Sequence, residues 1–175
     1  MRDDWQERLD GHREAVARFV KDVEALETER WEKRPAPEAW CPAQIAEHVL
    51  IVYEVAAREL QGGSGMRVRT GFWMRVFVRW KFLPQILRDG RIPKGAKAVR
   101  EIRPSDTPRA RQLFLEQFPK AAAAFETEIA RARDRNGHLT HAIFGKLSAR
   151  DALRFVAVHL ENHRRQLAPH TENGR

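Results

Sequence analysis

Residues 5–26 read WQERLDGHREAVARFVKDVEAL, and this stretch decides the class of fold. Its apolar residues recur at alternating steps of four and three, a spacing that places side chains on one face of an α-helix. We predict an amphipathic helix from about Asp3 to about Lys33, ending before Pro35, with His12 facing the core or a cavity. The predicted inner face comprises Trp5, Leu9, His12, Val16, Phe19, Val23 and Leu26.

A second helical stretch begins at Pro42, directly after Cys41, and ends at the glycines of residues 62–65. Proline suits the first turn of a helix, because its missing N–H would have no partner there. The side chain of Gln44 can reach back toward the cap. The inner face of this helix is expected to carry Ile45, His48 or Val49, Val52, Val55 or Ala56, and Leu60.

Two further helices are predicted in the second half of the chain. One starts after Thr107 with Pro108 in its first turn, contains Pro119, about one turn before which we expect a bend, and stops at Asn136. The other opens at Ser148, a helix cap with an acidic residue three positions later. Strand signals are weak, so the expected fold class is all-α: a four-helix bundle forming a single domain over residues 1–175.

The connection between the second and third helices, about residues 63–106, is too long for a simple turn. We expect a crossover with its own short helix, over Gly71–Leu83. The chain holds 32 Lys and Arg against 24 Asp and Glu, a net charge of +8. Residues 67–103 hold eleven of the basic residues and two acidic ones, so the excess charge belongs to this insertion.

The aromatic and basic segment 71–83 is open to several interpretations. The ordinary one is that its aromatic residues pack on the bundle or on a partner subunit while its arginines extend toward solvent. It could instead cover an anionic ligand, lie on a membrane surface or stack on RNA. No nucleic-acid-binding motif accompanies the charge, so we do not expect a nucleic acid partner.

Composition indicates a cytoplasmic protein. The residues are 42% hydrophobic and 32% charged, enough for a core, and no apolar stretch approaches the roughly 20 residues of a membrane span. The N-terminal sequence MRDDWQERLD is polar and unlike a secretory leader. Cys41 is the single cysteine, which excludes an internal disulfide.

Three histidines carry the candidate chemistry. His159 and His163 are four residues apart on the predicted fourth helix, so both imidazoles can reach one ion. His48 lies on the inner face of the second helix and could complete the set. Such an ion would keep open positions and lower the pKa of bound water or thiol. Zinc, nickel and iron all accept imidazole. Alternatively, these are ordinary hydrogen-bonded core residues.

Two segments resemble the DinB-like superfamily: residues 40–49, WCPAQIAEHV, and residues 141–148, HAIFGKLS, followed by His159-x-x-x-His163-x-x-Gln166. The resemblance implies a four-helix bundle with a three-histidine divalent-metal site, frequently as a dimer, and places the ligands at His48, His159 and His163. Members include S-transferases using bacillithiol, a mycothiol-dependent maleylpyruvate isomerase and metal-dependent hydrolases.

The chain departs from the family pattern at two positions. Cys41 stands where a Ser or Thr cap is usual, and Ala142 where a proline is frequent. Cys41 could be a reactive thiol, since a helix N-terminus lowers thiol pKa, or simply a weak cap. Gln166 could orient a ligand from outside the coordination sphere, or could lie on the surface.

The leading hypothesis is therefore a divalent-metal enzyme that activates a thiol or water for S-transfer to, or hydrolysis of, a small electrophilic substrate. A low-molecular-weight thiol would be its second cofactor, and a homodimer its assembly. The alternative is a non-catalytic interaction protein that uses segment 71–83 to bind a partner subunit, a membrane surface or nucleic acid.

Overall fold

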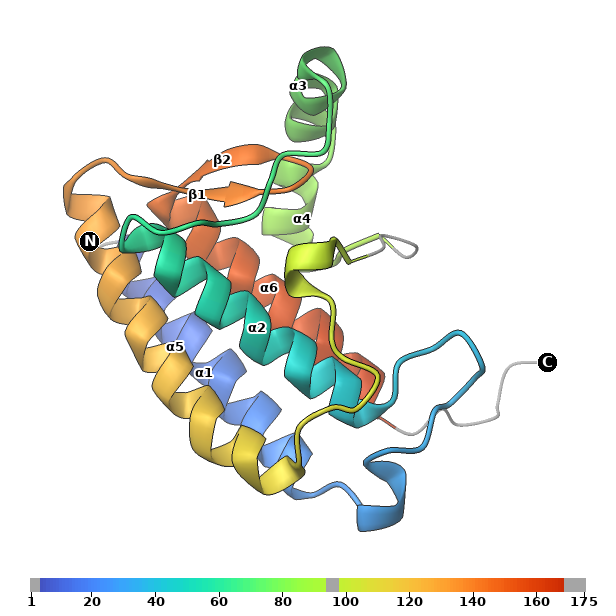
Figure 1. Ribbon diagram of the computed structural model, residues 1–175. Helices are drawn as coiled ribbons and strands as arrows, with labels where there is room; N and C mark the ends of the chain where they lie inside the picture. Colours follow the sequence, from blue (N-terminus) through green and yellow to red (C-terminus); the bar gives the residue numbers. More distant parts are fainter. Residues whose placement is uncertain (1–3, 94–97, 169–175) are drawn as a thin grey trace.

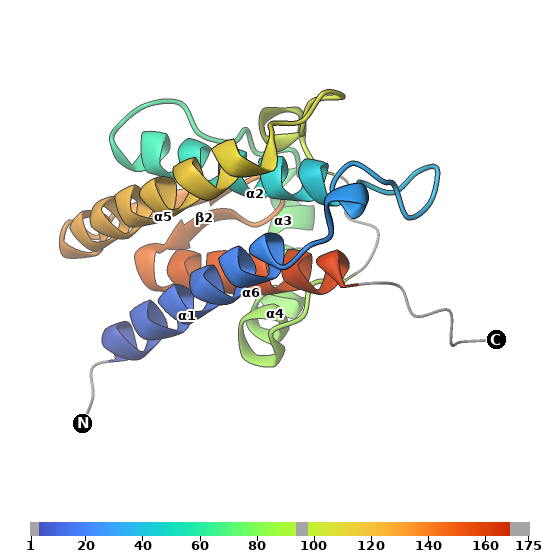
Figure 2. The ribbon, with the colours of Figure 1, turned by 90° about the horizontal axis from the view of Figure 1, so that it is seen from below.

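The computed structural model describes residues 4–93 and 98–168, and these are mostly helical. Four long helices, α1 (Asp4–Glu24), α2 (Pro42–Leu60), α5 (Arg111–Asp134) and α6 (Ala149–Leu167), lie side by side (Figures 1 and 2). The largest contacts join α1 to α6 and α2 to α5, and α2 also contacts α6. Helices α2 and α6 are therefore neighbours although about a hundred residues separate them.

An aromatic core holds the long helices together. Rings from α1, α2 and α5 meet in edge-to-face, tilted and stacked pairs at centroid distances of 5.0–5.9 Å. Burying large rings supplies much of the favourable free energy of folding. The residues are Phe19, Tyr53, Phe114, Phe118 and Phe125, all fully buried.

The ends of the first two helices differ in how well the sequence predicted them. Helix α1 ends at Glu24, not near Lys33, and residue Asp3 lies outside the described residues. The chain then forms a 3₁₀ turn, η1 (Thr28–Arg30), and the buried Trp31 after it accepts the Ala43 backbone N–H at 2.9 Å. Helix α2 begins at Pro42 as predicted, with the Cys41 backbone N–H donating to Gln44 Oε1 at 3.3 Å.

The third long helix starts later than predicted, whereas the fourth starts directly after its predicted cap. Helix α5 begins at Arg111, three residues after Pro108, and continues through Pro119. Helix α6 begins at Ala149, and Ser148 Oγ accepts the Asp151 backbone N–H at 3.2 Å, which confirms the predicted cap.

A β-hairpin joins α5 to α6, which the sequence analysis did not predict. Strands β1 (His138–His141) and β2 (Gly145–Ser148) pair antiparallel, with Leu139 opposite Leu147. Both leucines are buried against the helices. Strands of four residues are too short to show an alternating pattern, and the turn rests on Gly145 at a φ of 71°.

The crossover contains two helices where one was predicted. Helix α3 (Phe72–Lys81) and helix α4 (Leu83–Asp89) meet at Phe82, and the 3₁₀ turn η2 (Arg100–Ile102) follows. Helix α4 packs on α6, whereas α3 stands away from the long helices (Figure 1). The basic residues Lys94 and Lys97 lie outside the described residues.

The expectation that the aromatic residues of this segment pack on the bundle is met only by Phe82, and it is wrong for those of α3. Packing on a partner subunit stays a prediction. None of the residues of α3 is buried, and Trp73 and Trp80 are 81% and 77% exposed. The reason is geometric, since α4 occupies the surface of α6 and α3 extends beyond it. Within the described ranges, no helix has the length and apolar character needed to cross a membrane.

Candidate metal centre

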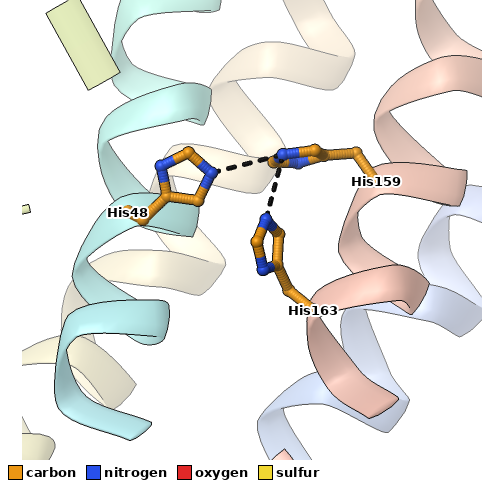
Figure 3. A group of neighbouring side chains, drawn as sticks. All are labelled: His48, His159 and His163. Atoms are coloured by element: carbon orange, nitrogen blue, oxygen red, sulfur yellow. Dashed lines mark hydrogen bonds between the residues drawn. The ribbon is translucent and has the colours of Figure 1, made fainter. Parts of the chain in front are cut away.

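Three imidazole rings meet between α2 and α6, and we call them the histidine triad: His48, His159 and His163 (Figure 3). His159 Nε2 lies 3.2 Å from His48 Nε2 and 3.1 Å from His163 Nε2. One ring nitrogen from each residue lies within 4.8 Å of the other two. Helix α6 places its two rings one turn apart, and packing against α2 brings His48 opposite them.

The outer nitrogens of two rings are already bound to oxygen atoms. His48 Nδ1 lies 2.6 Å from the carbonyl oxygen of Ile102, and His163 Nδ1 lies 2.9 Å from Oε1 of Gln166. Since these oxygens only accept, each Nδ1 must carry the proton and donate it. In the neutral ring, Nε2 is then left with a free lone pair that points toward the centre of the triad.

Burial keeps these rings neutral. Desolvation, reinforced by the neighbouring His163, lowers the pKa of His48 to about 3. Desolvation also lowers the pKa of His163, and it places the pKa of His159 well below its ordinary value of 6.5, with further lowering from the other rings. The imidazoles are therefore unprotonated at neutral pH, the form in which histidine binds a metal.

The triad fits a divalent cation better than it fits a hydrogen-bond network of its own. His159 has one ring proton and can donate it to only one of the two free Nε2 atoms beside it. The other short contact would then bring two lone pairs together. A tetrahedral ion bound at about 2.0–2.1 Å would hold nitrogens about 3.3 Å apart, close to the two short distances observed.

Aromatic side chains line the triad. The ring of Trp40 lies 5.0 Å from His48 and 6.5 Å from His163, and the ring of Phe155 is stacked 6.4 Å from His159. His48 and His163 are buried, while His159 is partly exposed. An apolar surrounding strengthens electrostatic interactions at the triad, and the partial exposure of His159 leaves it accessible from one side.

The carboxylate of Glu47 binds the loop that supports His48. Glu47, buried beside His48 in sequence, accepts hydrogen bonds from the backbone N–H and the hydroxyl of Ser105, at 2.8 and 2.9 Å. Gln44 Nε2 donates to the Ser105 carbonyl oxygen at 3.3 Å. These bonds tie residues 102–105 to α2, and so fix the Ile102 carbonyl that orients His48.

Neither Ile102 nor Glu47 was predicted from the sequence to support the site. A backbone carbonyl leaves no trace in a residue pattern, and the loop that brings it to His48 lies 54 residues further along the chain. Glu47 points away from His48 around the helix, as its spacing implies, and accepts its hydrogen bonds from Ser105. The one sequence feature that could have indicated a supporting role is the acidic Glu47 next to the candidate ligand His48.

Other residues considered from the sequence lie outside the triad. His12 is fully buried, with its nitrogens 2.9 Å from Glu126 Oε1 and 2.8 Å from the Tyr53 hydroxyl, as a satisfied core residue. Cys41 is buried at the cap of α2, so its thiol has no open approach.

The remaining histidines divide by exposure. His138 is exposed on β1, and His170 lies outside the described residues. The ring of His141 lies 4.8 Å from that of Phe155, and its Nδ1 accepts the backbone N–H groups of Ile143 and Phe144, so its Nε2 carries the proton. Desolvation lowers the pKa of His141 to about 4.

Fold and site together define a mostly helical protein with a three-histidine group that could hold a metal ion. The sequence model of the DinB superfamily matches residues 8–167, so the chain belongs to that superfamily. The DinB superfamily is a family of metal-binding proteins. The resemblance inferred from residues 40–49 and 141–167 is thereby confirmed. No curated protein and no solved structure matches the chain.

Proposed function

We propose that this protein is a metal-dependent enzyme in which His48, His159 and His163 hold one divalent ion. The observation that carries the proposal is the convergence of three neutral Nε2 atoms with too few protons to satisfy one another. Zinc, nickel and iron all suit three imidazole ligands. The reaction would be S-transfer from a low-molecular-weight thiol to a small electrophilic substrate, or hydrolysis of such a substrate.

The ligand set favours activation of a nucleophile. A bound divalent ion lowers the pKa of a coordinated water or thiol toward neutrality. Three imidazoles leave the charge of the ion uncompensated, which makes this effect strong. The chain's own contribution is to orient the ligands through Ile102 and Gln166, and to exclude bulk water with Trp40 and Phe155.

Several finer features belong to the same proposal. We expect α1, α2, α5 and α6 to form one four-helix bundle domain, with residues 63–106 inserted as the crossover. We also expect a homodimer in the cytoplasm, as the family resemblance and the composition suggested. The non-catalytic alternative keeps one supporting observation, the exposed aromatic residues of α3, and this surface can coexist with an enzyme site.

Metal content tests the proposal directly. The purified protein is stripped with chelator, reloaded anaerobically with zinc, nickel or iron, desalted and analysed for metal. We expect about one ion per chain, and none in the His159→Ala/His163→Ala variant. His138→Ala, which removes an exposed histidine from β1, is the matched control. The site would be overturned if the double variant retained as much metal as His138→Ala, or if the folded wild-type chain retained none.

The reaction class needs a second measurement. Metal-loaded protein is offered an activated aryl halide with and without a low-molecular-weight thiol, and separately an activated ester. Loss of thiol only with the metal present indicates S-transfer, whereas ester cleavage without thiol indicates hydrolysis. Turnover that persists in the His159→Ala/His163→Ala variant would place the chemistry elsewhere.

A further inference from the structure

Helix α3 presents an unusual surface to solvent. Six of its seven apolar side chains are 46–81% exposed, and only Val78 packs against the core, half-buried. Leaving this much apolar area in water is unfavourable, and contiguous exposed patches of this kind mark interaction sites. The side chains are Phe72, Trp73, Met74, Val76, Phe77 and Trp80.

The orientation of α3 is fixed by its basic side. Arg79 donates to the carbonyl oxygens of Phe144 and Lys146 in the β1–β2 turn, and the Arg75 side chain lies against Gly145. At about 100° per residue, the opposite side of the helix carries Trp73, Phe77 and Trp80. We call these three residues the apolar face of α3. They point away from the hairpin.

Helix α4, which follows α3 directly, is packed on the body of the protein. Leu83 and Ile86 of α4 are each 4% exposed, and Arg154 of α6 donates to the carbonyl oxygen of Leu87 at 3.0 Å. These contacts hold α4 on α6, and α3 projects beyond α4 at the top of Figure 1. The apolar face is therefore displayed outward and does not fold back on the protein.

The charge around this face selects the kind of partner. Residues 60–88 contain six basic residues and no acidic residue. A second copy of the chain docked on α3 would bring two such segments together, which like-charge repulsion disfavours. An anionic surface with an apolar layer beneath it meets both properties. The basic residues are Arg67, Arg69, Arg75, Arg79, Lys81 and Arg88. Two of them form ion pairs, Arg69 with Glu101 and Arg88 with Asp89, so the excess charge rests on the other four.

We propose that α3 attaches the protein to an anionic lipid bilayer surface. Tryptophan rings prefer the head-group level of a bilayer, and Arg and Lys beside them attract anionic lipids. Ten residues of helix are about 15 Å long, so α3 lies in the surface and does not cross it. The apolar face enters the acyl boundary while Lys81, whose ammonium lies 5.6 Å from the Phe77 ring, stays among the head groups.

Co-sedimentation of the full chain with vesicles tests this proposal. Vesicles of phosphatidylcholine alone are compared with vesicles containing about one third phosphatidylglycerol. We expect binding to the anionic vesicles only, at least about tenfold weaker in Trp73→Ala/Trp80→Ala and weakened by 0.5 M salt. Leu113→Ala, which removes an exposed apolar residue from α5, is the matched control and should bind as the wild type does.

Three results would overturn the proposal. The first is no binding to anionic vesicles by the folded wild-type chain. The second is equal binding by wild type and the double tryptophan variant. The third is a dimer in solution, or binding to single-stranded RNA, that the double variant loses while neither protein binds vesicles. Metal content of the double variant should equal that of the wild type, which separates this test from that of the metal site.

Discussion

At the scale of single residues, His159 is the centre of the site, because its Nε2 lies within 3.2 Å of both other triad nitrogens. The two outer rings each depend on one oxygen for their orientation. Ile102 supplies a backbone carbonyl that no side-chain substitution removes. Gln166 supplies a side-chain oxygen, and this makes it the residue through which orientation can be tested.

Gln166→Ala should weaken metal binding about 10–100-fold, the usual cost of losing a partner that orients a histidine ligand. Gln166→Glu keeps an oxygen acceptor for His163 Nδ1–H and should retain most of the affinity. Competition with a chromophoric chelator measures both variants. Equal weakening by Ala and Glu would show that the amide acts in some other way.

At the scale of elements, the start of α6 sets the register of two triad members. Ser148 closes β2 and caps α6 by accepting the Asp151 backbone N–H at 3.2 Å. The hairpin, the cap and the first turn of α6 thus form one continuous piece, from which His159 and His163 follow at fixed positions along the helix.

Ser148→Ala should lower the free energy of unfolding by about 1 kcal/mol, since it leaves a helix N–H without its cap. Ser148→Asp retains an acceptor oxygen and should unfold close to the wild type. Urea denaturation followed by circular dichroism measures the difference. The cap assignment fails if Asp destabilises the protein as much as Ala does.

At the scale of the whole molecule, the buried histidines link stability to pH. Burial lowers the pKa of His48 to about 3 and that of His141 to about 4, from an ordinary value of 6.5. Below pH 6.5 the unfolded chain therefore takes up protons that the folded chain excludes. By linkage, stability must fall as pH decreases from about 6.5 toward these lowered values.

The metal-free protein should accordingly melt at a lower temperature at pH 5 than at pH 7.5, measured in chelator by differential scanning calorimetry. His48→Asn removes one of the responsible groups and should show a smaller change. His138→Ala, on the exposed face of β1, should behave as the wild type does. A melting temperature that does not change between these pH values would contradict the linkage.

Much of the helical architecture could be predicted, because the long helices show helical periodicity or capping residues in the sequence. Three signals are local: the spacing of residues 5–26, Pro42 after Cys41, and Ser148 before α6. Each depends only on residues close together in the chain, so it can be read without the tertiary structure. The hairpin could not be predicted, since its four-residue strands acquire their pairing only between α5 and α6. The same holds for α3, whose exposure depends on where α4 docks.

The sequence alone determined that the chain is mostly helical, that it belongs to a recognisable family, and that His48, His159 and His163 lie on inward faces. Tertiary structure decided that their Nε2 atoms meet, that Ile102 and Glu47 support them, and that the apolar face of α3 is left in water. The physical reason is the range of the interactions. Helical periodicity arises within a few residues, whereas the convergence of rings from α2 and α6 exists only once the helices have packed.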